Sequence, residues 1–301
     1  MGQTPGQRRA IAEMGRALGP ETLAAVHRLY RTEHEERAAA TRCVAVDQPY
    51  GGHERHRLDV YATDDAGHEN VHSATRPVLL WVHGGGFVRG EKASPDHPFS
   101  AHVGHWAARL GLIGVVMNYR LCPEAAWPSG GDDVAAAVDW IGRHIATWRG
   151  DPTQIVVAGT SAGATHVATF LQNGALPVSV RSAILLSGVY GGVPIEPRDT
   201  AYLGKDVRIA PSRIAACGIP LFLVCAEFDP VRFQDDTMAL AAAARAQRGD
   251  WLPLAVVGGH NHFSLACHLG GTDQRLSDLL HCFIRDTCLT PIGDFYDDRS
   301  S

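Results

Sequence analysis

The chain has 301 residues, of which 45% are hydrophobic and 20% are charged, with a net charge of −5. This composition is typical of globular proteins and excludes a disordered chain, a collagen and a coiled coil. Lysine occurs only at Lys92 and Lys205, and there is no block of basic residues. Nucleic acid and an anionic membrane surface are therefore not expected as partners.

The first 40 residues predict two amphipathic helices, over 6–18 and 21–40, separated by Gly19-Pro20. A proline at the first position is a typical helix start. Residues 57–62 alternate as a strand does, and the polar stretch 63–76 predicts a hairpin-like loop. Residues 78–83, VLLWVH, form a continuous apolar run, which is typical of a strand buried on both faces.

Strands and helices then alternate to the end of the chain. Helices are predicted over 98–110, 129–145, 162–173, 234–246 and 272–286, and strands over 112–118, 155–158, 183–187, 221–226 and 252–257. This alternation predicts an α/β protein with a mostly parallel sheet covered by helices on both faces. No internal repeat or linker is visible, so one domain over 1–301 is expected.

Seven cysteines are present, an odd number with no C-x-x-C pair, and several lie in apolar runs. Reduced, buried thiols are the expected state. The first 20 residues carry charges and no unbroken apolar stretch, and no apolar run approaches the ~20 residues of a membrane span. We therefore expect a cytoplasmic protein.

The first chemical motif is Gly159-Thr160-Ser161-Ala162-Gly163, which has the form G-x-S-x-G. A predicted strand precedes it and a predicted helix follows. Small residues relieve the crowding of a sharp strand-to-helix turn, which exposes the serine hydroxyl above the sheet. The free N–H groups of the helix start point toward a reacting carbonyl.

The second motif, His83-Gly84-Gly85-Gly86-Phe87, directly follows the apolar strand at 78–83. Serine acyl transfer forms an oxyanion that needs two or three preset N–H donors. Glycines allow the backbone to come close because they have no Cβ. The two motifs together predict a serine hydrolase.

An acid and a histidine follow in the order Ser, acid, His that is typical of α/β hydrolases. Asp229 comes just after the strand at 221–226, with Glu227 as its nearest rival and Asp235 and Asp236 as more distant ones. Asp235 and Asp236 fit better as charges in the first turn of a helix.

Two histidines, His260 and His262, compete for the role of general base in the loop after the last strand. His262 is the choice and His260 the reserve. An H-x-H pair alone does not predict a metal site, because zinc needs at least three protein ligands. No metal and no cofactor are expected.

The stretches HGGGF, NYRLCPEAAWP, GTSAGA, EFDP and HNHF resemble the HGGG-bearing esterases of the α/β-hydrolase fold. The resemblance extends over about 57–285 and includes the hormone-sensitive-lipase-like enzymes and the feruloyl-esterase and arylformamidase-like hydrolases. It implies Ser161 as nucleophile, Asp229 as acid and His262 as base. It also implies backbone N–H donors at Gly84, Gly85 and Ala162.

Two departures from the lipase-like pattern bear on the substrate. GTSAGA replaces the usual GDSAGG, which leans toward the feruloyl-esterase and formamidase side, and the segment 188–219 is short for a lipase cap. The resemblance therefore implies a small cap made by 1–40 together with 188–219. Residues that flank the motifs are candidate pocket walls: Phe87, Val88, Tyr190, Phe228, Val231 and Phe263.

The resulting prediction is an enzyme that cleaves small-molecule carboxylic esters through an acyl-enzyme. Amide or formamide hydrolysis by the same three residues is the alternative, and a non-catalytic binding protein of the same fold is a third possibility. A homodimer is left open.

Overall fold

The computed structural model describes residues 2–63, 75–174, 176–191, 196–205 and 209–289. Most of the polar loop expected at 63–76 lies outside the described residues, and so do parts of the segment 188–219.

An eight-stranded sheet forms the centre of the molecule, in the order β1-β2-β4-β3-β5-β6-β7-β8. The strands from β4 to β8 pair in parallel, whereas β2 pairs antiparallel with both β1 and β4. The predicted mostly parallel sheet is therefore confirmed. The strands are β1 (Arg42–Pro49), β2 (Arg57–Ala62), β3 (Arg76–Val82), β4 (Ile113–Met117), β5 (Gly150–Thr160), β6 (Val180–Leu186), β7 (Leu221–Phe228) and β8 (Leu254–Asn261).

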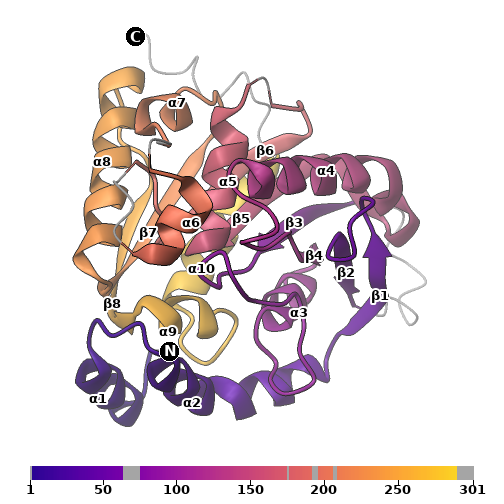
Figure 1. Ribbon diagram of the computed structural model, residues 1–301. Coiled ribbons are helices and arrows are strands. Elements are labelled where there is room, and N and C mark those ends of the chain that lie inside the picture. The colour runs from indigo at the N-terminus through magenta and orange to yellow at the C-terminus, as the bar shows by residue number, and fades with distance from the viewer. Residues whose placement is uncertain (1, 64–74, 175, 192–195, 206–208, 290–301) are drawn as a thin grey trace, which may run out of the picture.

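Helices cover both faces of this sheet (Figure 1). The apolar sides of α4 (Ser129–His144), α5 (Ala162–Gln172) and α8 (Val231–Arg248) share one buried cluster with one face of the strands. On the other face, α3 (Ala101–Arg109) and α10 (Arg275–Leu289) share a second cluster. The central strands are thus shielded on both sides, which explains their continuous apolar runs.

The two N-terminal helices, α1 (Pro5–Met14) and α2 (Pro20–Ala38), lie together at the lower edge of the view in Figure 1, next to α9 (His262–Cys267). There α1 packs on β8 and α2 on α9. Ile11, Val26 and Tyr30 form a third buried cluster with Phe99 and Cys267. The N-terminal helices therefore pack on β8 and α9, which come late in the sequence, rather than on β1 and β2, which follow them directly.

Five elements were not expected from the sequence: β1, the 3-10 helix η1 (Ile145–Trp148), and three α-helices, α6 (Pro197–Leu203), α7 (Pro211–Ala215) and α9. The edge strand β1 is half-exposed and irregular in register, so it lacks a clear alternating pattern. The three helices have only five to seven residues, too few to show a helical period. No described helix is long and apolar enough to span a membrane.

We expect Val157→Ala to lower the free energy of unfolding by about 2–3 kcal/mol, because Val157 is fully buried in the middle of β5 and its truncation leaves a cavity. The same change at Val178, which is 87% exposed, should stay within about 0.5 kcal/mol. Urea denaturation of both variants measures the difference, and equal effects would contradict this account of the core.

Candidate active site

Ser161 lies on the sharp turn between β5 and α5, with φ 54° and ψ −123°. This left-handed backbone is rare for a residue with a side chain and costs about 1–3 kcal/mol. A Cβ on Gly159 would lie 2.6 Å from the Gly163 carbonyl group, and one on Gly163 would lie 2.1 Å from the Val82 oxygen. The two glycines of the pentapeptide are therefore required by close backbone contacts.

The structure brings Ser161, His262 and Asp229 together, although 101 residues separate the first two in sequence. His262 Nε2 lies 2.9 Å from Ser161 Oγ, and His262 Nδ1 lies 2.7 Å from Asp229 Oδ1. These distances are those of hydrogen bonds. A serine, an imidazole and a carboxylate in this sequence of contacts can activate the serine hydroxyl.

The carboxylate of Asp229 is fully buried, and its second oxygen has two donors of its own. Oδ2 accepts hydrogen bonds from the Ser187 hydroxyl at 2.5 Å and from the Ala226 N–H at 2.6 Å. Arg16, which follows α1, donates to the Asp229 carbonyl oxygen. Sequence reasoning missed both Ser187 and Arg16, because neither belongs to a motif.

The ring of His262 is held from the side as well as by its two polar contacts. Phe233 stacks on it at 4.3 Å between centroids. His262 is also the first residue of α9, whose start is capped by the Asn261 side chain, which accepts from the Ser264 N–H. The imidazole is therefore fixed in orientation and only 5% exposed.

The glycine loop after β3 lies directly beside Ser161. A Cβ on Gly84 would be 3.3 Å from the Ser161 Cβ, and one on Gly85, which has φ 142°, would be 1.8 Å from the Arg89 oxygen. In the described part of the chain, no acceptor is bonded to the N–H groups of Gly84, Gly85 or Ala162. These three donors remain available to a ligand.

His83, the first residue of this loop, has a structural position. It is buried, its Nδ1 contacts the Gly84 oxygen at 2.7 Å, and its ring stacks on Tyr119. Burial lowers the pKa of His83 to about 4, with the Gly84 contact opposing the shift. It is therefore neutral near pH 7 and adds no charge to the loop.

The other acids considered for the role of Asp229 are Glu227, Asp235 and Asp236, and none of them is bonded to His262. Glu227 accepts from the Gly259 N–H at 2.7 Å, and Asp236 accepts from the Tyr190 N–H at 3.2 Å. Asp235 is exposed on α8. None of the three contacts a histidine in the described residues, so only Asp229 reaches His262.

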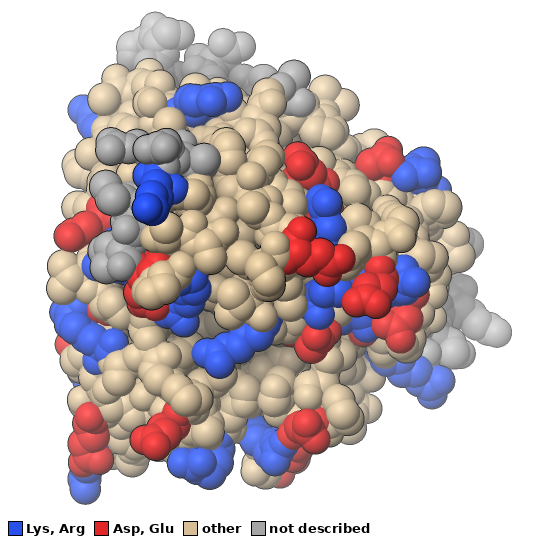
Figure 2. Space-filling view, viewed as in Figure 1, with Lys and Arg blue, Asp and Glu red and all other residues tan. Residues whose placement is uncertain are grey.

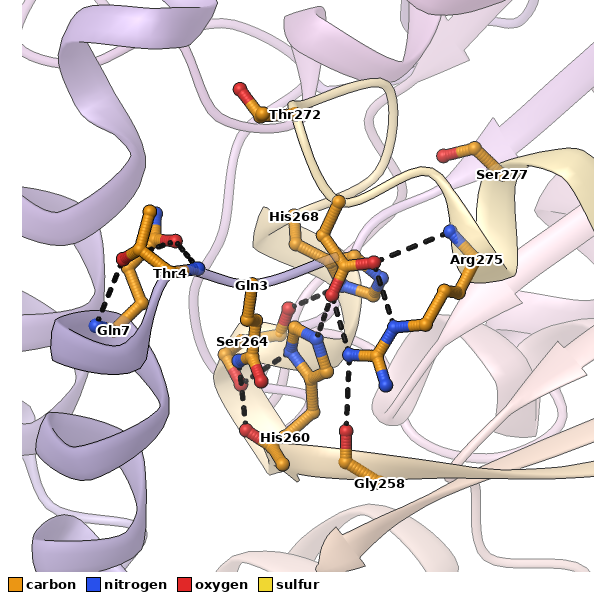
Figure 3. Close-up of polar contacts among 12 residues, drawn as sticks. Gln3, Thr4, Gln7, Gly258, His260, Ser264, His268, Thr272, Arg275 and Ser277 are labelled. Atoms are coloured by element: carbon orange, nitrogen blue, oxygen red, sulfur yellow. Dashed lines mark hydrogen bonds and ion pairs between the residues drawn. The ribbon is translucent and has the colours of Figure 1, made fainter. Parts of the chain in front are cut away.

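His260 belongs to a separate buried network, shown in Figure 3. Its Nε2 lies 3.2 Å from Asp273 Oδ2 and its Nδ1 lies 3.1 Å from Ser264 Oγ. Arg275 binds the same carboxylate at 2.6 Å and the Gly258 oxygen at 3.2 Å. Burial lowers the pKa of His260, while Asp273 opposes that shift. This network connects the end of β8 to the start of α10.

A cavity of about 360 Å³ opens above Ser161. Phe87 and Phe263, two of the expected wall residues, line it together with Gly84, Gly85, Ala162 and His262. Leu18, Leu23 and His27 from the N-terminal segment also line it.

The other four expected wall residues do not line this cavity. Val88 and Val231 are 43% and 56% exposed and face solvent, so their neighbours Arg89 and Arg232 line it instead. Tyr190 is fully buried, and its hydroxyl accepts from the Gly188 N–H. Phe228 packs against the cluster of the N-terminal helices. Proximity to a motif in sequence did not predict side-chain direction at these positions.

Within the described ranges, no group of three or more His, Cys, Asp or Glu side chains is arranged to hold a metal ion. The seven cysteines are unpaired, and four of them are buried. Burial raises the pKa of Cys225 to about 11, with the Asp229 charge adding to the shift, so this thiol near the site stays protonated.

Comparison with known proteins supports the same fold. A family profile described as alpha/beta hydrolase fold matches residues 79–217. The chain has an α/β-hydrolase fold. A hyperthermophilic esterase from Pyrobaculum calidifontis has a TM-score of 0.65 at 18% identity, over 96% of this chain and 100% of that one. The esterase LipW from Mycobacterium marinum has a TM-score of 0.65 at 21% identity, over 96% of each chain.

Curated relatives match over a shorter region. A probable carboxylic ester hydrolase, LipM of Mycobacterium tuberculosis, is 36% identical over 118 residues, which are 39% of this chain and 26% of the relative. The carboxylesterase NlhH of the same species is 41% identical over 96 residues, 32% of this chain and 29% of the relative. The matched region thus spans less than a third of the length of these relatives.

The His260 network gives a pH-dependent prediction. Burial alone would raise the pKa of Asp273, but hydrogen bonds from Arg275 and His260 outweigh it and bring that pKa well below its usual value. Asp273→Asn should therefore lower the free energy of unfolding by about 2 kcal/mol near pH 7, since charged hydrogen bonds are lost.

The pKa of Asp273 is lower in the folded than in the unfolded state, so its contribution is complete above about pH 5 and declines as the pH falls below about 4. We would measure urea denaturation near pH 7 and again below about pH 4. The difference in free energy of unfolding between wild type and Asp273→Asn should shrink at the lower pH. Asp235→Asn, at an exposed position, is the control. A difference that grows in acid would contradict the assigned direction.

Proposed function

We propose that this protein is a serine carboxylesterase that uses Ser161 as nucleophile, His262 as general base and Asp229 as the acid that orients the base. The observation that carries the proposal is the continuous set of contacts from Asp229 Oδ1 through His262 to Ser161 Oγ, at 2.7 and 2.9 Å. In this proposal the chain is one catalytic domain over 1–301.

In the first step, Ser161 Oγ attacks the ester carbonyl while His262 Nε2 takes its proton. The carbonyl oxygen becomes an oxyanion, which the N–H groups of Gly84, Gly85 and Ala162 would stabilise. Their freedom from other acceptors among the described residues supports this assignment. Asp229 is buried, and its second oxygen accepts two hydrogen bonds. In this proposal it keeps the imidazole in the required tautomer and stabilises the imidazolium cation.

In the second step, the imidazolium protonates the leaving alcohol, and the C–O bond to it breaks. Water then attacks the acyl-enzyme while His262 takes a proton from the water. His262 passes this proton to Ser161 Oγ as the bond between Oγ and the acyl group breaks. The acid product and the free enzyme result. Apart from the ester and one water molecule, no group outside the chain is needed for this proposed cycle.

The relatives favour esters over amides as substrates, since LipM and NlhH are both named for carboxylic ester hydrolysis. We further propose that 1–40 and 188–219 together cover the site. Leu18 and His27 from the first segment and Arg198 from the second line the cavity, which supports this arrangement.

Ser161→Ala should reduce turnover of p-nitrophenyl acetate by about 10⁶-fold, because loss of a triad serine removes the nucleophile. The change removes one small polar atom beside the cavity, so the thermal unfolding curve should stay close to that of the wild type. Stopped-flow or steady-state release of p-nitrophenol is the measurement. Activity above about a hundredth of the wild type would rule out Ser161 as nucleophile.

The two histidines can be separated by matched alanine variants. His262→Ala should lower kcat by several orders of magnitude, as removal of a triad base does. His260→Ala should lower kcat only about tenfold, equivalent to about 1.4 kcal/mol, through disorder at the end of β8, which its network holds. Assaying both variants on one activated ester decides the question, and a dead His260→Ala beside a mildly impaired His262→Ala would reverse the assignment.

A further inference from the structure

Arginine is concentrated at the cavity that contains Ser161. Arg89, Arg198 and Arg232 line it, each from a different part of the chain. Figure 2 shows basic side chains beside a hollow near the middle of this face. A site for small neutral esters needs no such cluster, because ester groups carry no charge.

Two of these arginines form ion pairs with one acid, Glu196. Arg198 Nη2 lies 2.5 Å from Glu196 Oε2, and Arg232 Nη2 lies 3.3 Å from Glu196 Oε1. Arg232 also pairs with Asp199. Both acids cap the start of α6. Asp199 lines the cavity, whereas Glu196 does not. The guanidinium groups are thus pre-oriented, so a ligand would not have to immobilise them.

Both arginines lie close to residues that neighbour the proposed reaction centre. A Cβ on Gly86 would lie only 3.2 Å from Arg198 Cδ and Nη1, so Arg198 lies along the glycine loop beside the proposed oxyanion donors. Arg232 Cζ lies 4.5 Å from the centre of the Phe233 ring, which in turn stacks on His262. The arginines are therefore close enough to Ser161 for one substrate molecule to reach both. Its ester would lie at Ser161 while another of its groups binds the arginines.

Charge counting leaves an excess of positive charge around the cavity. Three guanidinium groups, Arg89, Arg198 and Arg232, face two carboxylates, Glu196 and Asp199. Arg89 is exposed and has no carboxylate partner among the described residues. Of the two acids that line the cavity, Asp199 pairs with Arg232, and Glu91 pairs with Arg55 at 2.7 Å. The Nε atoms of Arg198 and Arg232 are buried without a partner among the described residues.

We propose that the preferred substrate of this site is an ester that also carries a free carboxylate, bound by Arg198 with Arg232 and Arg89 beside it. This rests on the proposed esterase function. A guanidinium fork pairs well with a carboxylate, and such charged hydrogen bonds are stronger than neutral ones. Leu18, Leu23 and Phe99 form an apolar part of the lining, which suits a hydrocarbon portion between or beside the two groups.

The test compares esters of equal shape that differ only in charge. Para-acetoxybenzoate and para-acetoxybenzamide place the charge on the alcohol side, and monomethyl adipate and its primary amide place it on the acyl side. In at least one pair the wild type should show a kcat/KM about tenfold or more higher for the carboxylate, equivalent to about 1.4 kcal/mol. The favoured pair identifies the side that meets the arginines.

Arg198→Met keeps most of the side-chain length and removes the charge, and it should reduce this carboxylate-to-amide ratio by about tenfold. Arg143→Met is the matched control, since Arg143 is 60% exposed on α4 and does not line the cavity; it should leave the ratio unchanged. Thermal unfolding of each variant shows whether it folds.

Several outcomes would overturn the proposal. Equal turnover of both members in both pairs by the wild type would show that the site ignores the carboxylate, while the esterase function would stand. An equal loss for both members in Arg198→Met would assign that arginine to the reaction or to the fold instead of to the substrate. Failure to hydrolyse any of these esters or p-nitrophenyl acetate would remove the esterase function itself.

Discussion

The left-handed backbone at Ser161 is the constraint on which the rest of the site depends. It reverses the chain between β5 and α5 within one residue, so the side chain stands above the sheet while the start of α5 points toward the same space. The strain is tolerated because Gly159 and Gly163 allow the flanking backbones to touch. A Ser161 N–H bond to the Leu186 oxygen at 2.8 Å fixes the turn to the neighbouring strand.

The parallel sheet supplies the remaining groups at the same edge. The glycine loop follows β3, Ser161 follows β5, Ser187 follows β6, Asp229 follows β7 and His262 follows β8. Because parallel strands all end on one side, residues far apart in sequence meet there, as is general in open α/β sheets. The N-terminal segment adds to this edge through Arg16, which contacts the residue that orients the proposed base.

The fold and the positions of Ser161 and Asp229 at strand ends were predictable because each is marked by a local pattern, whereas His262 had to be chosen over His260. The strand before G-x-S-x-G, the glycines after VLLWVH and the apolar run before Asp229 all depend on backbone geometry that few residue types allow. The arginines of the cavity and the Ser187 contact were not predictable in this way. The three arginines come from segments far apart in the chain, and Ser187 meets Asp229 across 42 residues. No short stretch of sequence encodes such contacts. Four of the six expected wall residues lie outside the cavity lining for the same reason: Val231 is 56% exposed, whereas its sequence neighbour Arg232 lines the cavity.

The two histidine networks show why contact geometry alone does not define a catalytic site. His260 also lies between an acid and a hydroxyl, Asp273 and Ser264, but its two ring nitrogens are exchanged relative to those of His262. Its contacts are 3.2 and 3.1 Å, longer than the 2.7 and 2.9 Å of His262. Moreover, Ser264 is fully buried inside α9, and its hydroxyl already bonds the backbone of Asn261. Ser161 instead borders the cavity, beside three N–H groups that have no acceptor among the described residues. Access for a substrate and free donors for the developing charge separate the proposed catalytic set from a network that stabilises the fold.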